Sequence, residues 1–281
     1  MHLADPVPER FAPLVQVDEA LARPRLLGLL SSASPAGARL TWLSAPAGFG
    51  KTTALAQMAQ QARAKGTAVA WLNCAEHDKD ASLFTEDLQA ALTASQPRGL
   101  TTAPQTIAPA SWLASQTESL LVCIDEYDAA ASPDTDALVE QLARVLPAHV
   151  HLLVAGRESL DPAFTRLQLA GLARHIDAEV LRFSRDEALS LLTSVLPARE
   201  AAQVADYAQG WPFALQLARL CAAGQVPGQG TGLDWEMDPR ARIPRRQVFE
   251  YLAREVIGRL PPVLRTFLDD VAVLDTIDPA L

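Results

Sequence analysis

A stretch of ten residues, SAPAGFGKTT (44–53), constrains the fold of this chain more than any other part of its sequence. It follows the apolar run RLTWL and precedes a segment, 51–65, whose apolar residues recur at helical spacing. Glycines between a strand and a helix let the backbone curl, so that several N–H groups and the helix N-terminus point at one phosphate chain. The segment therefore predicts a phosphate-binding loop, and a glycine-rich turn without a ligand is the alternative.

The pattern is that of a Walker A loop, with Ala45 in place of the usual first glycine. The two glycines would let the backbone approach the phosphates, and Lys51 would reach the β- and γ-phosphates. Thr52 would offer its hydroxyl to Mg²⁺, and Thr53 could contact the α-phosphate. The residues expected to bind the nucleotide are Ala47, Gly48, Phe49, Gly50, Lys51, Thr52 and Thr53.

A second motif supplies what a phosphate loop needs to hold a metal ion. The apolar run LLVCI (120–124) ends in Asp125 and Glu126. Because parallel α/β sheets bind ligands at the carboxyl ends of their strands, Asp125 is expected beside the phosphate loop, where it would hold Mg²⁺. Glu126 could polarise the attacking water. This is a Walker B strand, which adds ATP hydrolysis to the expected activity; a solvated acidic loop is the alternative.

The next apolar strand ends in the tripeptide AGR, with Arg157 last. A guanidinium at this edge of the sheet can hydrogen-bond a γ-phosphate and so distinguish ATP from ADP. Arg157 is therefore the candidate sensor, and Lys51, Glu126 and Arg157 are the residues expected to act in hydrolysis. A surface arginine in a salt bridge is the alternative. His149 and His151 have no third ligand near them in the sequence, so they are expected to be structural.

Apolar runs alternate with helical patterns over most of the chain, which predicts an α/β fold with a mainly parallel sheet. Five strands are expected, at residues 40–43, 68–72, 120–124, 150–155 and 180–183. From residue 184 the pattern changes, because SRDE (184–187) is a capping box that opens a helix and helical patterns continue to the end. A second, helical domain is expected to begin there. The stretches 93–111 and 224–234 are expected to be a surface loop and a linker.

The composition limits the type of protein and the partners that this chain is expected to have. The chain has 281 residues, of which 49% are hydrophobic, and this is enough to bury a core. It has no run of about 18 apolar residues and no secretory leader at MHLADPVPER, so a cytoplasmic protein without membrane contact is expected. The net charge of -9 disfavours DNA contact by this chain itself, because phosphate-backbone binding depends on Lys and Arg. The three cysteines are far apart and are expected to be reduced.

Together these motifs resemble the nucleotide-binding module of STAND-class P-loop ATPases, and in particular of MalT-like transcriptional regulators in the LuxR family. The resemblance runs from residue 22 to the last residue and rests on eight stretches in a fixed order. They are RPRLL, APAGFGKTT, AWL, CIDEYD, AGR, LRFSRDEALSLL, GWPFALQLA and FEYLAREVIGRLPPVLRTFLDDVAVLD. The resemblance implies an N-terminal extension (1–20), a P-loop domain (21–183), a helical lid (184–232), and a linker with the first helices of a winged-helix domain (233–281).

The resemblance also implies roles for single residues. In this family the proline of the GWP corner lies against the adenine, so Pro212 becomes an expected nucleotide contact, whereas by physics alone GWP is a corner between helices. The arginine after the fourth strand is a γ-phosphate sensor in the family, which supports Arg157. Relatives often carry Leu-Asp where this chain has Asn73-Cys74, and Asp-Asp-Tyr-His where it has Asp-Glu-Tyr-Asp (125–128). Family members continue into a helical-repeat sensor and a helix-turn-helix, so the sequence is expected to be an excised fragment or a shortened relative.

The expected function is that of a switch which binds ATP or ADP with Mg²⁺, hydrolyses ATP slowly, and uses the difference to control self-association of a full-length transcriptional regulator. A nucleotide-gated scaffold that binds ATP or ADP without turnover is one alternative, and a Glu126 that fails to reach the water would be its mark. A P-loop kinase is another. It would need an acceptor pocket and an arginine-rich lid, whereas the lid segment here is apolar.

Overall fold

The computed structural model of the chain describes residues 9–15, 17, 20–31, 38–95, 108–157 and 162–224. The chain divides into two compact units, Met1–Arg182 and Phe183–Leu281. The linker expected beyond residue 224 and the winged-helix portion (233–281) lie outside the described residues.

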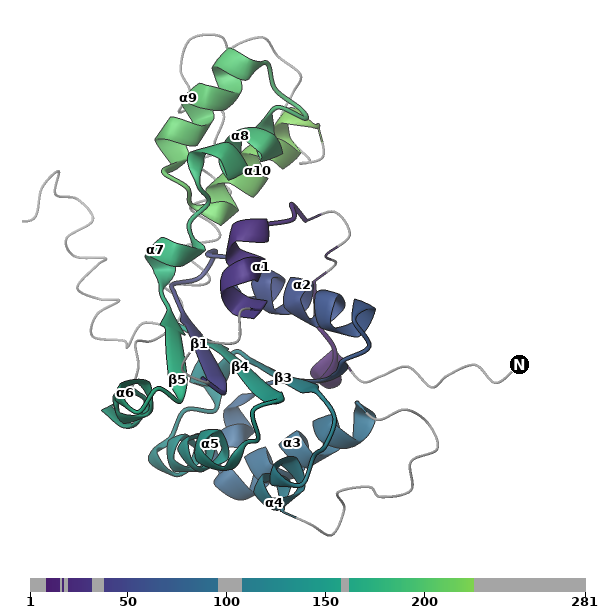
Figure 1. Cartoon of the computed structure of the whole chain (residues 1–281). Helices are drawn as coiled ribbons and strands as arrows, with labels where there is room; N and C mark the ends of the chain where they lie inside the picture. Colours follow the sequence, from purple (N-terminus) through teal and green to yellow (C-terminus); the bar gives the residue numbers. More distant parts are fainter. Residues whose placement is uncertain are drawn as a thin grey trace, which may run out of the picture. The chain divides into compact units, whose positions relative to one another are not determined.

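The first unit alternates strands with helices along the chain (Figure 1). Its strands are β1 (Leu40–Ser44), β2 (Ala68–Asn73), β3 (Leu120–Asp125), β4 (Val150–Gly156) and β5 (Ala173–Ile176). Its α-helices are α1 (Pro24–Ser31), α2 (Lys51–Ala64), α3 (Ala81–Ala94), α4 (Pro109–Ala114), α5 (Pro133–Val145), α6 (Pro162–Leu169) and α7 (Ala178–Leu181). Short 3-10 turns add η1 (Glu9–Phe11), η2 (Glu76–Lys79) and η4 (Tyr127–Ala129).

The five strands form one parallel sheet in the order β2-β3-β4-β1-β5. This confirms the predicted α/β fold with a five-stranded parallel sheet. Because β4 lies between β3 and β1, the carboxyl ends of these three strands are neighbours. The register places Ser44 opposite Gly156, and Asn73 opposite Asp125. The loops that follow β1, β3 and β4 therefore share one edge of the sheet.

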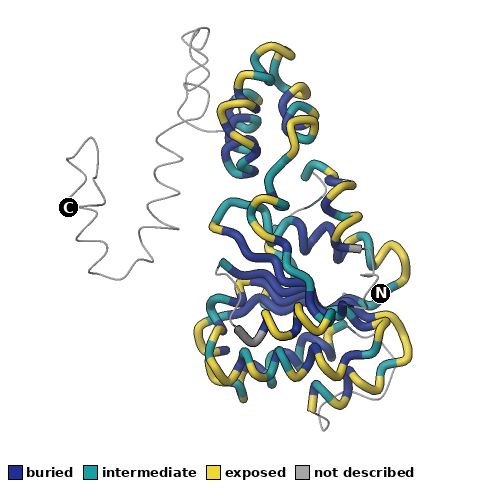
Figure 2. The backbone as a smooth tube through the Cα atoms, turned by 60° about the vertical axis from the view of Figure 1, so that its left-hand side comes forward, coloured by how far each residue is buried: buried dark blue, intermediate teal, exposed yellow. Residues whose placement is uncertain are grey.

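Helices cover both faces of the sheet, and the strands between them are buried (Figures 1 and 2). Successive residues of a strand point to opposite faces of the sheet, so alternate side chains of β3 pack in different cores. Leu120, Val122 and Ile124 pack in the larger core with α3 to α6, and Leu121 and Cys123 pack in the smaller core under α1 and α2. The near-continuous apolar strands are thus explained by burial on both sides.

The prediction of a fifth strand at 180–183 is wrong. Residues Ala178–Leu181 form α7, because the Asp177 side chain accepts a hydrogen bond from the Val180 N–H and caps a helix start. The fifth strand is β5, whose middle residues are polar and half-buried. They have partners on β1: the Ser44 Oγ lies 2.6 Å from His175 Nε2, and Arg174 donates to Thr41 Oγ1 at 3.2 Å. An edge strand with such partners needs no apolar run.

The second unit is helical within its described residues. Its helices are α8 (Arg185–Leu192), α9 (Ala198–Ala208) and α10 (Pro212–Ala222). The predicted capping box is confirmed, since the Ser184 N–H donates to the Glu187 carboxylate at 2.8 Å and the Glu187 N–H donates to the Ser184 hydroxyl at 3.2 Å. Pro212 is buried at the first position of α10.

A single peptide group joins the two units, and its polar atoms are both bonded. The carbonyl oxygen of Arg182 accepts hydrogen bonds from the Arg23 and Arg25 guanidinium groups, at 2.7 and 2.9 Å, within the first unit. The N–H of Phe183 donates to the Gly210 carbonyl at 2.9 Å, within the second unit. The arginines of the RPRLL stretch thus hold the backbone where the first unit ends.

Two expectations from composition can be checked against the described residues. Cys74, Cys123 and Cys221 are buried free thiols, as expected, and burial raises the pKa of each thiol. No helix in the described ranges combines the length and the hydrophobicity that crossing a bilayer would require.

Candidate nucleotide-binding site

The loop between β1 and α2 has the backbone conformation that its glycines predict. Gly48 has φ 81°, and Gly50 has φ 76° and ψ 26°, values in the left-handed region that favours glycine. Helix α2 begins at Lys51 directly after Gly50 and has no side-chain cap. The first N–H groups of a helix have no partner inside the helix, so this end of α2 is suited to bind an anion.

Lys51 is within electrostatic range of the charged residues that follow β3 and β4. Its Nζ donates to the carbonyl oxygens of Ala45 at 2.6 Å and Pro46 at 3.2 Å. Burial is the main cause that lowers the pKa of the Lys51 ammonium, the Asp128 carboxylate opposes this, and the Arg157 guanidinium adds to it. The fold thus brings the phosphate-loop lysine near residues that follow β3 and β4.

Thr52 and Asp125, the two expected metal ligands, are brought together. The Thr52 side chain lies close enough to the Asp125 carboxylate to lower its pKa, and the Glu126 N–H donates to Asp125 Oδ1 at 2.9 Å. Asp125 is only 2% exposed, and burial raises its pKa more than these two neighbours lower it. A buried carboxylate beside a hydroxyl oxygen is a donor set that suits Mg²⁺, which prefers oxygen ligands. These residues therefore fit a nucleotide-bound magnesium ion.

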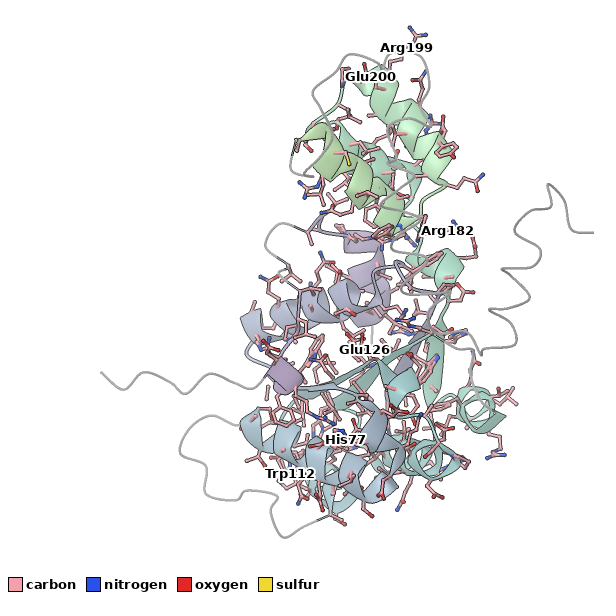
Figure 3. All side chains as sticks on the ribbon, turned by 180° about the vertical axis from the view of Figure 1, so that it is seen from behind. His77, Trp112, Glu126, Arg182, Arg199 and Glu200 are labelled. Atoms are coloured by element: carbon pink, nitrogen blue, oxygen red, sulfur yellow. The ribbon has the colours of Figure 1, made fainter. Side chains whose placement is uncertain are left out.

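Glu126 is exposed directly after β3 (Figure 3). Its backbone has φ 53° and ψ 36°, a left-handed conformation that costs a residue with a side chain about 1–2 kcal/mol. Such strain persists only where the surroundings enforce it, and it is common at functional sites. Here it turns the chain so that Tyr127 enters the core while Glu126 stays in solvent.

Arg157 follows β4 and faces the turn that follows β3. Its backbone N–H donates to Asp128 Oδ1 at 3.2 Å, and its Nε lies 3.6 Å from Asp128 Oδ2. The sensor candidate thus lies at the same edge as Lys51 and Asp125, and it is engaged with a carboxylate that the sequence interpretation did not include.

The remaining predicted nucleotide contacts lie in both units. Ala47, Phe49 and Thr53 are half-buried in or beside the loop. The Arg182 guanidinium lies over the Phe49 ring, 5.5 Å from its centroid. Pro212 belongs to the second unit, so its predicted contact with the adenine stays a prediction.

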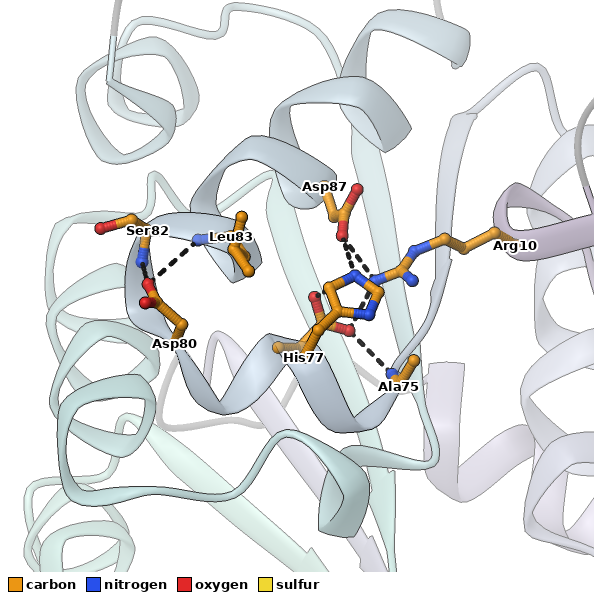
Figure 4. Close-up of polar contacts among 8 residues, drawn as sticks. Arg10, Ala75, His77, Asp80, Ser82, Leu83 and Asp87 are labelled. Atoms are coloured by element: carbon orange, nitrogen blue, oxygen red, sulfur yellow. Dashed lines mark hydrogen bonds and ion pairs between the residues drawn. The ribbon is translucent and has the colours of Figure 1, made fainter.

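A second polar cluster lies after β2, away from the phosphate loop in sequence (Figure 4). The Arg10 guanidinium contacts Asp78 Oδ2 and Asp87 Oδ2, each at 2.6 Å, and His77 Nε2 lies 2.9 Å from Asp87 Oδ2. The ligand atoms of His77, Asp78 and Asp87 lie within 4.8 Å of one another, a spacing that could hold a metal ion. Arg10 already supplies the positive charge between the carboxylates, so the cluster is best explained as an anchor for the N-terminal segment.

Asn73, at the end of β2, binds the N-terminal segment. Its side-chain N–H₂ donates to the carbonyl oxygens of Glu9 and Ala12, both at 2.8 Å, and its Oδ1 accepts from Trp71 Nε1 at 2.7 Å. The side chain is fully used in holding the N-terminal segment to the end of β2. Sequence reasoning missed this role, because nothing near Asn73 in the sequence signals a partner more than 60 positions away.

The comparisons with known proteins agree with this geometry. Residues 29–159 match the family model described as an AAA domain. This part of the chain is a nucleotide-binding AAA-type P-loop ATPase domain. The matched range includes the phosphate loop, the Asp125 strand and Arg157.

Several solved structures resemble the chain that carries this AAA-type domain. The Walker-type ATPase of Pyrococcus abyssi superposes with a TM-score of 0.56 at 13% identity, over 89% of this chain and 77% of that one. The Orc1 protein of Aeropyrum pernix, in complex with DNA, gives 0.49 at 15% identity, over 89% and 71%. The RuvB Holliday junction branch migration motor of Thermotoga maritima gives 0.43 at 17% identity, over 92% and 84%. At 13% identity, the first similarity shows a shared fold and nothing more specific.

Proposed function

We propose that the AAA-type domain binds ATP or ADP with Mg²⁺, hydrolyses ATP slowly, and serves as the nucleotide switch of a MalT-like transcriptional regulator of the LuxR family. The observation that supports the nucleotide part is the proximity of the Thr52 side chain to the buried Asp125 carboxylate, whose pKa it lowers. The fold brings the residue expected to offer a hydroxyl to Mg²⁺ near the carboxylate expected to hold the ion, although the two are 73 positions apart in the sequence.

The residues of the loop have distinct roles in this proposal. The N–H groups at the start of α2 bind the phosphate oxygens, and Lys51 exchanges its bonds to the Ala45 and Pro46 carbonyls for bonds to the β- and γ-phosphates. Thr52 and Asp125 would hold Mg²⁺, which would supply positive charge against the negative charge of the phosphates.

In this proposal Glu126 acts in ATP hydrolysis, and Arg157 distinguishes ATP from ADP. The exposed Glu126 carboxylate accepts a proton from the attacking water, as its position after β3 allows. Arg157 binds the γ-phosphate, so the domain holds ATP and ADP differently. A nucleotide shifts the equilibrium between two conformations only if it binds one of them more tightly than the other. In this proposal the contact between Arg157 and the γ-phosphate provides that difference.

The regulatory part of the proposal rests on the sequence resemblance. In it, Pro212 contacts the adenine, and the ATP-bound state of the full-length protein self-associates. The eight stretches in family order support this part, and the AAA-type domain supports its nucleotide dependence.

A nucleotide-gated scaffold is the second candidate, and the exposure of Glu126 favours it. A glutamate that stays in solvent and does not reach the attacking water would leave binding intact and turnover negligible. Binding and turnover therefore have to be measured separately.

The test is a calorimetric titration with ADP and Mg·ATP, followed by single-turnover hydrolysis, on the 281-residue chain. Lys51→Ala is expected to weaken binding of both nucleotides at least about 100-fold, because it removes charge-assisted bonds worth about 1.5–3 kcal/mol each. Lys65→Ala, after the other end of α2, is the matched control and should bind as the wild type does.

The outcomes separate the candidates. Wild-type binding with phosphate release supports the ATPase switch, and wild-type binding without release supports the scaffold. A Lys51→Ala variant that binds with the wild-type dissociation constant would remove the Walker A assignment and both candidates with it.

A further inference from the structure

One carboxylate, that of Asp128, engages both the backbone and the side chain of Arg157. Oδ1 accepts the hydrogen bond from the Arg157 N–H at 3.2 Å, and Oδ2 lies 3.6 Å from the Arg157 Nε. The two residues follow β3 and β4, which are adjacent in the sheet. Asp128 therefore influences both the path of the chain at Arg157 and the direction of its guanidinium.

Close packing of the strand ends makes this contact possible. A Cβ on Gly156 would lie 3.3 Å from the Trp42 ring and 3.7 Å from the backbone nitrogen of Asp128. A Cβ at this position would press on the Trp42 ring, which would have to give by a few tenths of an ångström, and would be in ordinary contact with the η4 turn. The end of β4 before Arg157 therefore lies close to both Trp42 and that turn.

The turn that carries Asp128 is itself firmly held. The Tyr127 hydroxyl donates to Asp136 Oδ1 at 2.7 Å, and its buried ring packs edge-on against the Trp42 ring, with centroids 5.3 Å apart. With Tyr127 anchored in the core, the next residue has little freedom. The Asp128 carboxylate is therefore a preorganised partner for Arg157.

The pair is accessible and lies near the phosphate loop. The side chains of Arg157 and Asp128 are 24% and 22% exposed, so an anion from solvent can reach the guanidinium. The two charges act on Lys51 with opposite signs, which places both within electrostatic range of the lysine expected to bind the β- and γ-phosphates. A terminal phosphate at Lys51 would meet the carboxylate and the guanidinium together.

We propose that Asp128 is the positioning residue for Arg157: it holds the guanidinium at the sheet edge, and a γ-phosphate must compete with it for that guanidinium. Asp128 thereby sets how strongly the domain prefers ATP to ADP. This inference rests on the proposed nucleotide-binding function.

The test compares the dissociation constants of ADP and a non-hydrolysable ATP analogue. Asp128→Asn keeps an oxygen that can accept from the Arg157 N–H but removes the competing charge. It is expected to raise the preference for the ATP analogue about fivefold, the size of one partly exposed ion pair. Asp128→Glu restores the charge and should return the preference to within about twofold of the wild-type value.

Two controls separate this effect from a general change of charge. Glu140 is an acid that also pairs with arginines, to Arg144 at 2.7 Å and Arg166 at 3.4 Å, and Glu140→Gln should leave the preference unchanged. In an Arg157→Ala background, Asp128→Asn should also leave it unchanged, because the group being competed for is gone.

The results distinguish this inference from the proposed function. If the wild type binds neither nucleotide, both are overturned. If the wild type binds both nucleotides but Asp128→Asn does not change the preference for the ATP analogue, only the positioning role is overturned. The same holds if Asp128→Asn shifts that preference by the same factor in the Arg157→Ala background as in the wild type.

Discussion

His151 should make the first unit less stable in mild acid. The Thr41 hydroxyl accepts a hydrogen bond from Arg174 at 3.2 Å and lies 2.9 Å from His151 Nε2. The hydroxyl can still donate its own proton to Nε2 when the His151 ring is neutral and that nitrogen is unprotonated. Burial lowers the pKa of His151 to about 4, and the nearby Arg174 guanidinium contributes to this fall. The folded protein therefore holds this imidazole neutral.

The sign and size of the effect follow from the two pKa values. The ordinary histidine pKa of 6.5 applies to the unfolded chain, and the folded value is about 4. Between these values the unfolded chain binds a proton that the folded one does not, so the free energy of unfolding falls as the pH falls. Full linkage gives a loss of about 2 kcal/mol between pH ~7.5 and pH ~5. Partial exposure of His151 reduces this to about 1–2 kcal/mol.

The assay is urea unfolding followed by the fluorescence of the buried tryptophans at the two pH values. His151→Gln removes the titrating group, so its loss of stability on acidification should be smaller than that of the wild type by about 1–2 kcal/mol. His149→Gln is the control, because that side chain is exposed, with Nε2 2.7 Å from the Gln116 carbonyl oxygen. An identical pH dependence in His151→Gln and the wild type would refute the reasoning.

Two further predictions concern the metal ligand and the second unit. Glu126→Gln should keep Mg·ATP bound and slow phosphate release, whereas Asp125→Asn should weaken the Mg²⁺-dependent part of binding, measured by titration with and without EDTA; an equal loss of binding in both variants would contradict their separate roles. Ser184→Ala should destabilise the second unit by about 1 kcal/mol, because the Glu187 N–H loses its cap. Thermal unfolding would measure this, and a shift no larger than that of Ser190→Ala, at an exposed position of α8, would show that the cap contributes nothing.

Local patterns were enough to predict the elements that carry the candidate site. The helix expected at 51–65 is α2 at Lys51–Ala64, and the strand that ends in Asp125 is present. The positive φ of Gly48 and Gly50 follows from the phosphate-loop pattern, because short-range sterics decide it. The proximity of Thr52 to Asp125 follows from the sheet edge on which both were expected.

Features that depend on which strands are neighbours could not be predicted. The pairing of Asp128 with Arg157 requires β4 to lie beside β3, and the sequence does not state the order of strands. The same holds for β5, since its polar Arg174 and His175 suit a strand only because β1 offers them partners. Long-range hydrogen bonds of this kind leave no local periodicity.

The peptide group between Arg182 and Phe183 is held by hydrogen bonds at both of its polar atoms. Its oxygen is held by Arg23 and Arg25, and its N–H by Gly210. A rotation about the bond before this group would release the arginine bonds, worth about 1.5–3 kcal/mol each when the donor is charged. A rotation after it would release the backbone bond, worth about 0.5–1.5 kcal/mol. The backbone at the end of the first unit is therefore stabilised by two arginines more than 150 positions earlier in the chain.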